Sequence, residues 1–358
     1  MRILALSLLA ALPAFAQDAD RRHIVFDGHP PDSLSCDTMV RVMPDDSWVL
    51  VMLGGGDKEP DPRNRVYLSR SPDEGATWSP MEPIDLGVKS KDPDIAIIPT
   101  ELVVFDDRVV LYVATHIGGF HGWDSWSVTS RDSGRTWGPL EPLPGKLRKA
   151  TFVRNRIDTP DGRILIAFQH YLTDGPTDPR NGVMISEDGG QTFSIHGDIR
   201  ISQDDDYRGF AENTIVQLAD GRIVMLIRAD KLGGVLFRSD STDGGLTWSE
   251  ARPTDIPNPG SKATLYSLGD DRVALVHNPN PNYRSPLALW VSFDGMATWG
   301  YRRILDDNPP ERKSQRGGRN GLNYPDGFVD PSGRFLHFAY DRWRSQAIYY
   351  RVELPQAP

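Results

Sequence analysis

An eight-residue pattern, Ser-x-Asp-x-Gly-x-Thr-Trp, returns along the chain at nearly even intervals and constrains its fold more than any other feature. Four close copies, and a fifth with Met296 where glycine is expected, begin at Ser71, Ser130, Ser186, Ser241 and Ser292. These starts lie 59, 56, 55 and 51 residues apart. A short pattern repeated at a nearly fixed period indicates a repeated supersecondary unit that buries its apolar face against the next copy.

Each repeat has the composition of several short antiparallel strands. The Asp and Gly of the pattern suit a tight hairpin turn, because Asp bonds nearby backbone amides and Gly accepts a positive φ. A second hairpin of the Asp-Gly type, such as Asp161-Gly162 or Asp220-Gly221, comes earlier in each unit. Since no helical period is sustained anywhere, we expect an all-β protein.

The number of hairpins predicts the number of repeats. The sequence contains six hairpins of the second type and five copies of the pattern. These counts predict a six-bladed β-propeller over residues 17–358. The last unit lacks an outer strand, and residues 22–26 are expected to supply it by pairing near Tyr349. Ahead of this domain, residues 1–16 combine a basic start, an apolar run and a small-x-small end, which predicts a signal peptide. We therefore expect a soluble protein that is secreted or periplasmic, without membrane insertion.

Charge and cysteine content exclude several classes of function. The chain has 40 Lys and Arg against 49 Asp and Glu, a formal net charge of −9, whereas nucleic-acid binding needs clustered basic residues. Its one cysteine, Cys36, excludes an intrachain disulfide and a cysteine-based zinc site. We expect no nucleic-acid partner, no metal and no cofactor.

Polar residues gather where the innermost strands of a propeller begin. The first residues of these strands face the mouth of the central funnel, where propellers bind ligands. Counting back nine positions from the turn of the second hairpin reaches Glu212, Lys262 and Tyr324 in three of the units. Equivalent regions hold Arg154-Asn155 in the third unit and Asp37 in the first. These residues predict a polar pocket of mixed charge.

The repeated pattern resembles the Asp-boxes of the sialidase superfamily, and the likeness covers essentially all of residues 17–358. In that superfamily the box is a marker of fold, because it occurs in glycosidases, lyases and binding proteins alike. Three further stretches are similar to sialidase site segments: residues 209–228 with Glu212 and Arg228, residues 280–292 with Arg284, and residues 322–327 with Tyr324.

The resemblance implies a role for each of these residues. Tyr324 would be the nucleophile and Glu212 its base, because an anionic nucleophile is repelled by the carboxylate beside the anomeric carbon of a sialic acid. Arg228 and Arg284 would grip that carboxylate. Asp61 best matches the position of the acid that protonates the leaving oxygen, and Glu59 is the second candidate.

The first unit departs from the sialidase pattern. Sialidases carry a further arginine on the first inner strand, and Asp37 stands near that place here. Arg154 or Arg156 of the third unit would then complete the grip, or the substrate differs from an ordinary sialic acid. Asn155, Asp37 and Lys262 are expected to contact the sugar.

The leading hypothesis is therefore an exo-glycosidase that removes a terminal acidic sugar from a glycan or oligosaccharide with retention of configuration. One alternative is a uronate-specific polysaccharide lyase, in which His116, His121, His170 and Tyr171 transfer protons. Another is a glycan-binding propeller without catalytic activity. The sequence leaves these alternatives open.

Overall fold

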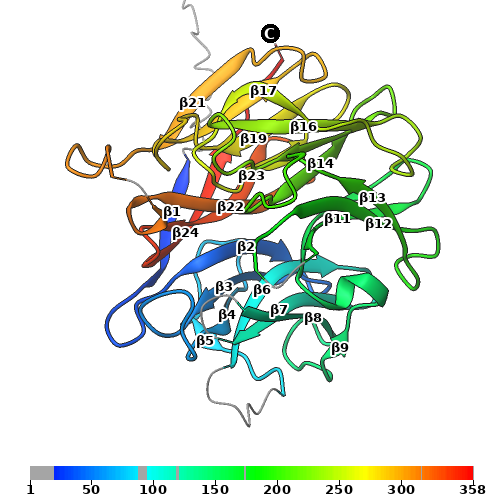
Figure 1. Ribbon diagram of the computed structural model, residues 1–358. Coiled ribbons are helices and arrows are strands. Elements are labelled where there is room, and N and C mark those ends of the chain that lie inside the picture. The colour runs from blue at the N-terminus through cyan, green and yellow to red at the C-terminus, as the bar shows by residue number, and fades with distance from the viewer. Residues whose placement is uncertain (1–19, 88–94, 118–120, 173–174, 316, 358) are drawn as a thin grey trace, which may run out of the picture.

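The computed structural model describes residues 20–87, 95–117, 121–172, 175–315 and 317–357, without the side chain of residue 121. It forms six four-stranded antiparallel sheets around a central axis (Figure 1). The predicted all-β, six-bladed propeller is thus confirmed. The expected signal peptide, residues 1–16, lies outside the described residues.

The blades follow one another along the chain, and each runs from an inner to an outer strand. Blades one to three contain β2 (Cys36–Val42), β3 (Trp48–Gly54), β4 (Arg65–Ser71), β5 (Glu82–Pro83); β6 (Ile95–Val104), β7 (Val109–Ile117), β8 (His121–Ser130), β9 (Glu141–Pro142); and β10 (Thr151–Asp158), β11 (Ile164–Tyr171), β12 (Pro179–Ser186), β13 (Ser194–Ile199). Blades four to six contain β14 (Asn213–Gln217), β15 (Ile223–Ile227), β16 (Val235–Ser241), β17 (Arg252–Pro257); β18 (Thr264–Ser267), β19 (Val273–His277), β20 (Leu287–Ser292), β21 (Tyr301–Asp306); and β22 (Leu322–Val329), β23 (Phe335–Arg342), β24 (Gln346–Glu353), β1 (Arg21–Asp27).

Within the described residues the only helices are two short 3₁₀ turns, η1 (Gly145–Arg148) and η2 (Gly318–Asn320). None of the helices in this part of the chain has the length and apolar character needed to cross a membrane.

The first strand closes the ring, as predicted. β1 pairs antiparallel with β24, with His23 opposite Tyr349 and Ile24 opposite Ile348. In Figure 1 the blue β1 lies beside the red β24, although the two are at opposite ends of the chain. Blade six is therefore built from both ends of the described chain.

The hydrophobic core lies between neighbouring blades rather than within one. One cluster joins blades five and six through Leu289, Val291, Phe338 and Ile348, and other clusters join blades one and two and blades three and four. Successive inner strands contact one another around the axis, from β2 through β6, β10, β14 and β18 to β22. This continuous wall of strands fixes the side chains that face the axis.

Four inner strands contain register shifts that point side chains toward one mouth of the axis. The shifts lie between Cys36 and Met39 in β2, at Pro99–Glu101 in β6, at Val153–Arg156 in β10 and at Asn323–Asp326 in β22. A β-bulge of this kind bends the strand and re-aims a side chain. The shifts in β2 and β22 contain Asp37 and Tyr324, two non-glycine residues with positive φ.

Candidate active site

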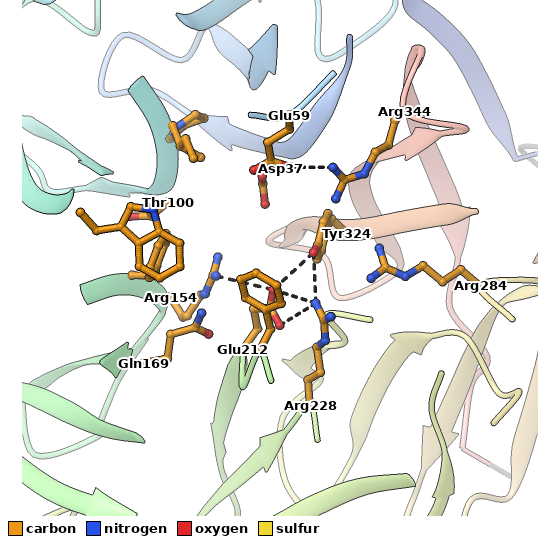
Figure 2. A pocket seen from close by; sticks show the side chains of 15 residues that line it. Asp37, Glu59, Thr100, Arg154, Gln169, Glu212, Arg228, Arg284, Tyr324 and Arg344 are labelled. Carbon is orange, nitrogen blue, oxygen red and sulfur yellow. Dashed lines mark hydrogen bonds and ion pairs between the residues drawn. The ribbon is translucent and has the colours of Figure 1, made fainter. Parts of the chain in front are cut away.

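A pocket of about 180 Å³ opens at the mouth toward which these bulges point. All six blades contribute to it. Its polar lining consists of Asp37, Glu59, Thr100, Arg154, Gln169, Glu212, Arg228, Arg284, Tyr324 and Arg344 (Figure 2). Its apolar lining consists of Ile98, Pro99, Trp123, Phe152 and Phe210.

Tyr324, Glu212 and Arg228 form one hydrogen-bonded group in this pocket. The Tyr324 hydroxyl donates to Glu212 Oε1 at 3.3 Å. Arg228 Nη1 lies 3.0 Å from each Glu212 carboxylate oxygen and 3.1 Å from Tyr324 Oη. Burial, and then the charge of Glu212, raise the pKa of Tyr324 above its usual value, although Arg228 acts in the opposite direction. In the unliganded protein Tyr324 is therefore a neutral phenol in contact with a carboxylate that can accept its proton.

Asp230 fixes the position of Arg228. The other guanidinium nitrogens of Arg228 donate to Asp230, Nε to Oδ1 at 2.7 Å and Nη2 to Oδ2 at 2.9 Å. Such bidentate pairing sets the plane of a guanidinium group. Arg228 thus reaches Tyr324 and Glu212 from a fixed direction.

Arg284 and Arg154 approach from two other sides. Arg284 donates to Asn323 Oδ1 and to the Gly260 carbonyl at 3.1 and 2.7 Å, and its guanidinium lies 5.4 Å from the centre of the Tyr324 ring. Arg154 is 5% exposed, and its Nη2 lies 3.9 Å from Glu212 Oε1. The Nε of Arg154 is buried and has no hydrogen-bond partner among the described residues.

A pair of carboxyl groups, Asp37 and Glu59, forms the wall on the side of blade one. Their oxygens and the Cys36 sulfur lie within 4.8 Å of one another. Arg344, which follows β23, donates from Nη1 to Glu59 Oε2 at 2.5 Å. Burial, and then the neighbouring Glu59, raise the pKa of Asp37 to about 6. The two carboxyl groups thus differ in environment, because Arg344 pairs with Glu59 alone.

The same trio does not suit a metal ion. Cys36, Asp37 and Glu59 have the geometry of a possible ligand group among the described residues. However, burial raises the pKa of the Cys36 thiol, and Arg344 already neutralises Glu59. A metal cation needs deprotonated ligands whose negative charge is not already neutralised, so we assign no metal to this group.

Asp61, the expected proton donor, is not among the described residues that line this pocket. Arg63 donates to both of its oxygens, Nε to Oδ1 at 3.0 Å and Nη2 to Oδ2 at 3.1 Å. These hydrogen bonds lower the pKa of Asp61, so the group stays ionised. An ionised carboxylate held by arginine is a poor source of protons.

The described lining also lacks Lys262, Asn155 and Arg156. Lys262 forms a buried ion pair with Asp326. The Asn155 amide bridges two inner strands by accepting from the Ile215 N–H and donating to its carbonyl, both at 2.9 Å. Arg156 pairs with Asp158 and lines a separate cavity, together with Asn155. The bulge in β10 therefore presents Arg154, and neither of the next two residues, to the pocket.

The histidines proposed for a lyase are not among the described lining residues. His170 Nδ1 pairs with Thr151 Oγ1 at 2.8 Å, while its neighbour Gln169 faces the pocket. Burial lowers the pKa of His116. The side chain of His121 lies outside the described part of the chain.

Arg344 was missed from sequence, although the signal that identified Arg228 also applies to it. Arg228 follows the second strand of blade four, and Arg344 follows the second strand of blade six. Trp343 and Arg344 both have positive φ in the turn after β23, and Arg344 lines the pocket. An arginine that follows the second strand of a blade was therefore a sequence signal that could have identified Arg344.

Comparison with known proteins supports the assignment of a family. Residues 50–337 match the family model described as a BNR repeat-like domain. A sialidase of Bacteroides fragilis is 26% identical over 282 residues, and one of Micromonospora viridifaciens is 24% identical over 277 residues. Each alignment covers 68% of this chain, but only 49% and 41% of these relatives, so the chain spans about half their length or less.

Among solved structures, the fold is similar to that of the Hadza microbial sialidase Hz136, with a TM-score of 0.71 and 18% identity. That alignment covers 90% of this chain and 66% of the other. A family model that matches most of the chain, five Asp-boxes and a closed six-bladed ring agree with one another. The chain therefore belongs to the BNR repeat-like domain family of the sialidase superfamily.

Proposed function

We propose that this protein is a sialidase-like exo-glycosidase that removes a terminal acidic sugar, with Tyr324 as nucleophile and Glu212 as its base. The observation that carries the proposal is the hydrogen bond from Tyr324 Oη to Glu212 Oε1, at 3.3 Å, in a pocket lined by four arginines.

The charge of the pocket favours an anionic substrate. Arg154, Arg228, Arg284 and Arg344 face three carboxyl groups, one of which has a raised pKa and is partly neutral near pH 6. Arginine is suited to a carboxylate because its planar donors bind both oxygens. Arg228 and Arg344 are held by close carboxylate partners, whereas Arg284 donates only to neutral oxygens and Arg154 approaches Glu212 at 3.9 Å, so we propose that Arg284 and Arg154 bind the substrate carboxylate.

The size of the pocket favours a single terminal sugar. A volume of about 180 Å³ lies below the range of roughly 300–1,000 Å³ that is typical of small-molecule sites. A site this small favours one terminal sugar residue over several residues of a glycan. We therefore propose action at the end of a chain rather than within it.

The first step follows from the positions of the three central residues. Tyr324 Oη would form a bond to the anomeric carbon while its proton passes to Glu212. Arg228, within 3.1 Å of the phenol oxygen, would stabilise the negative charge that develops there. A neutral nucleophile avoids repulsion by the substrate carboxylate, which explains why a tyrosine serves here.

The test compares wild type with Tyr324→Phe on an aryl sialoside and on uronate-terminated oligosaccharides. We expect the wild type to release a sugar with retained anomeric configuration, as followed by NMR. We expect Tyr324→Phe to lose roughly 10³-fold or more in kcat, because only the nucleophilic oxygen is removed. Tyr301→Phe, on outer strand β21 and away from the pocket, is the matched control and should keep full activity.

Three results would contradict the proposal. An unsaturated product would indicate elimination, and therefore a lyase. Full activity in Tyr324→Phe would remove this residue from the chemistry. Binding of the glycan without any product would favour a propeller that only recognises sugars.

A further inference from the structure

Asp37 occupies a backbone position that mirrors that of Tyr324. Both lie in bulges of inner strands, with φ of 47° and 52°, and both side chains face the pocket. Backbone strain at non-glycine residues clusters at functional sites, because the surrounding structure must hold it in place. In Figure 2 Asp37 and Glu59 lie together on one side of Tyr324, while Glu212 lies on the other.

The carboxyl groups of Asp37 and Glu59 lie close together but have different partners. Glu59 is held by Arg344, whereas the one hydrogen bond to the Asp37 carboxyl from a described residue comes from Cys36 Sγ, at 3.3 Å. The other charged groups that act on Asp37 are Arg154 on β10, Lys262 ahead of β18 and Asp341 on β23. Two carboxyl groups this close do not both ionise readily, and the one without an arginine partner retains the proton.

We propose that Asp37 is the proton donor to the leaving group, and that Glu59, held by Arg344, keeps Asp37 protonated. This inference rests on the function proposed above. It places the acid on the first inner strand, where sialidases are expected to carry an arginine, and it replaces Asp61 in that role.

The proposed steps balance. As Tyr324 Oη bonds to the anomeric carbon, the bond from that carbon to the leaving oxygen breaks, and the Asp37 proton passes to that oxygen. The Tyr324 proton passes to Glu212. In the second half, the Asp37 carboxylate takes a proton from the attacking water, the bond from carbon to Tyr324 breaks, and Glu212 returns its proton to the phenol oxygen.

The raised pKa of Asp37, about 6, supports this assignment, because a group that donates a proton must hold it near the working pH. The causes of the shift are burial first and the charge of Glu59 second. Removing that charge in Glu59→Gln should lower the pKa of Asp37 and move the alkaline limb of activity to lower pH.

The experiment compares leaving groups on the same sugar. Wild type and Asp37→Asn are assayed on 4-nitrophenyl α-sialoside, whose phenolate departs without a proton, and on sialyllactose, whose alcohol needs one. We expect Asp37→Asn to lose roughly 10²–10⁴-fold in kcat/KM on sialyllactose and less than about tenfold on the nitrophenyl substrate. Asparagine tolerates positive φ, so the bulge should keep its shape. Asp61→Asn is the control and should affect both substrates equally.

The outcomes separate the two proposals. Equal losses on both substrates in Asp37→Asn, or a loss confined to sialyllactose in Asp61→Asn, would overturn the role of Asp37 alone. A wild type that cleaves neither substrate would overturn the proposed sialidase-like activity, and this inference with it. A loss confined to sialyllactose in Asp37→Asn, together with the shifted pH limb in Glu59→Gln, would support the assignment.

Discussion

Tyr324 owes its place in the pocket to an unfavourable backbone conformation. A positive φ costs a non-glycine residue about 1–2 kcal/mol, and an aromatic side chain gains nothing from it locally. Here the bulge between Asn323 and Asp326 turns the ring toward the axis, where Arg284 lies over its face. The surrounding strands must therefore maintain the strain, which links the position of this side chain to the rigidity of blade six.

Buried acids around the pocket should make the stability of the protein depend on pH. Asp341 is fully buried, and burial raises its pKa to about 7 despite the opposing effect of Arg344. In the unfolded chain the pKa of an aspartate is near 4. Because the folded protein holds this proton more tightly, the stabilising contribution is present below about pH 4 and is lost as pH rises toward about 7.

We therefore expect Asp341→Asn to be more stable than wild type at pH 8, by up to about 4 kcal/mol, and similar at low pH. An asparagine oxygen can still accept from Asn323 Nδ2 and from the Arg344 N–H, as Asp341 Oδ1 does at 2.6 and 3.0 Å. Denaturant unfolding between pH 4 and 8 measures the difference. Since Asp37 and Glu101 also have raised pKa values, the pH dependence should weaken rather than vanish. Parallel curves for both proteins would contradict this prediction.

The sequence predicted some site residues and not others, for reasons that lie in local geometry. Glu212 directly precedes inner strand β14 and Tyr324 is the third residue of β22, so counting along the repeat sufficed to place them near one another. Asp61 resembled an acid in a loop, but the sequence did not show that Arg63 would turn back onto it. Arg344 follows the second strand of its blade, as Arg228 does, but the sequence did not show the two consecutive positive φ values at Trp343 and Arg344.

At the scale of the element, the Asp-box is a hydrogen-bonded cap on the turn between two strands. In the first box Ser71 Oγ donates to Asp73 Oδ1 and accepts from the Gly75 N–H, and Asp73 accepts from the Thr77 N–H and hydroxyl, all at 2.7–2.9 Å. The degenerate box keeps this pattern, since the Met296 N–H donates to Ser292 Oγ at 2.9 Å. Met296 adopts a φ of 65° there, and the burial of its side chain in the core offsets the strain.

The glycine of the first box should be sensitive for two separate reasons. Gly75 has a φ of 80°, and a Cβ there would lie 2.6 Å from Tyr349 Cζ on strand β24. The Tyr349 hydroxyl is paired with His337 Nδ1 at 2.7 Å, so the ring cannot move aside without losing that bond. Gly162, with a φ of 86° and nothing within 4 Å of an added Cβ, isolates the conformational effect.

We expect Gly162→Ala to destabilise the protein by about 1–2 kcal/mol, and Gly75→Ala by about 1–3 kcal/mol more, because overpacking adds to the backbone strain. The shift in the midpoint of guanidinium unfolding measures both. Equal shifts would show that blade one and strand β24 are less tightly packed than the structure indicates.

At the scale of the whole molecule, the even spacing of the boxes predicted the ring, because each repeat buries its apolar face only against the next. The number of blades and the closing role of the first strand followed from that spacing and from the missing outer strand of the last unit.

The interior of the ring was not predictable in the same way. Arg41 pairs with both Glu101 and Asp326, and Lys262 pairs with Asp326, so charges from four separate strands or their flanks meet near the axis. This cluster of charged side chains depends on the register of all these strands together, which the sequence does not show.

Closure by β1 should determine the stability of the entire ring. The strand contributes a ladder of six residue pairs to β24, and Arg22 adds an ion pair to Asp306 of blade five at 2.7 Å. If each ladder hydrogen bond stabilises the fold by about 1 kcal/mol, the strand contributes roughly 5 kcal/mol before its apolar contacts are counted, against about 5–15 kcal/mol for a whole domain.

A chain that begins at Gly28 should therefore unfold at a much lower guanidinium concentration than one that begins at Asp20. Its exposed β24 edge should also promote association, which size-exclusion chromatography would detect. A synthetic peptide of residues 20–27 should restore the midpoint when added in excess, because it supplies the missing strand without covalent linkage. If the shortened chain unfolds at the same midpoint as its control, and stays monomeric, the ring is held by contacts between inner strands alone, and the closing strand is dispensable.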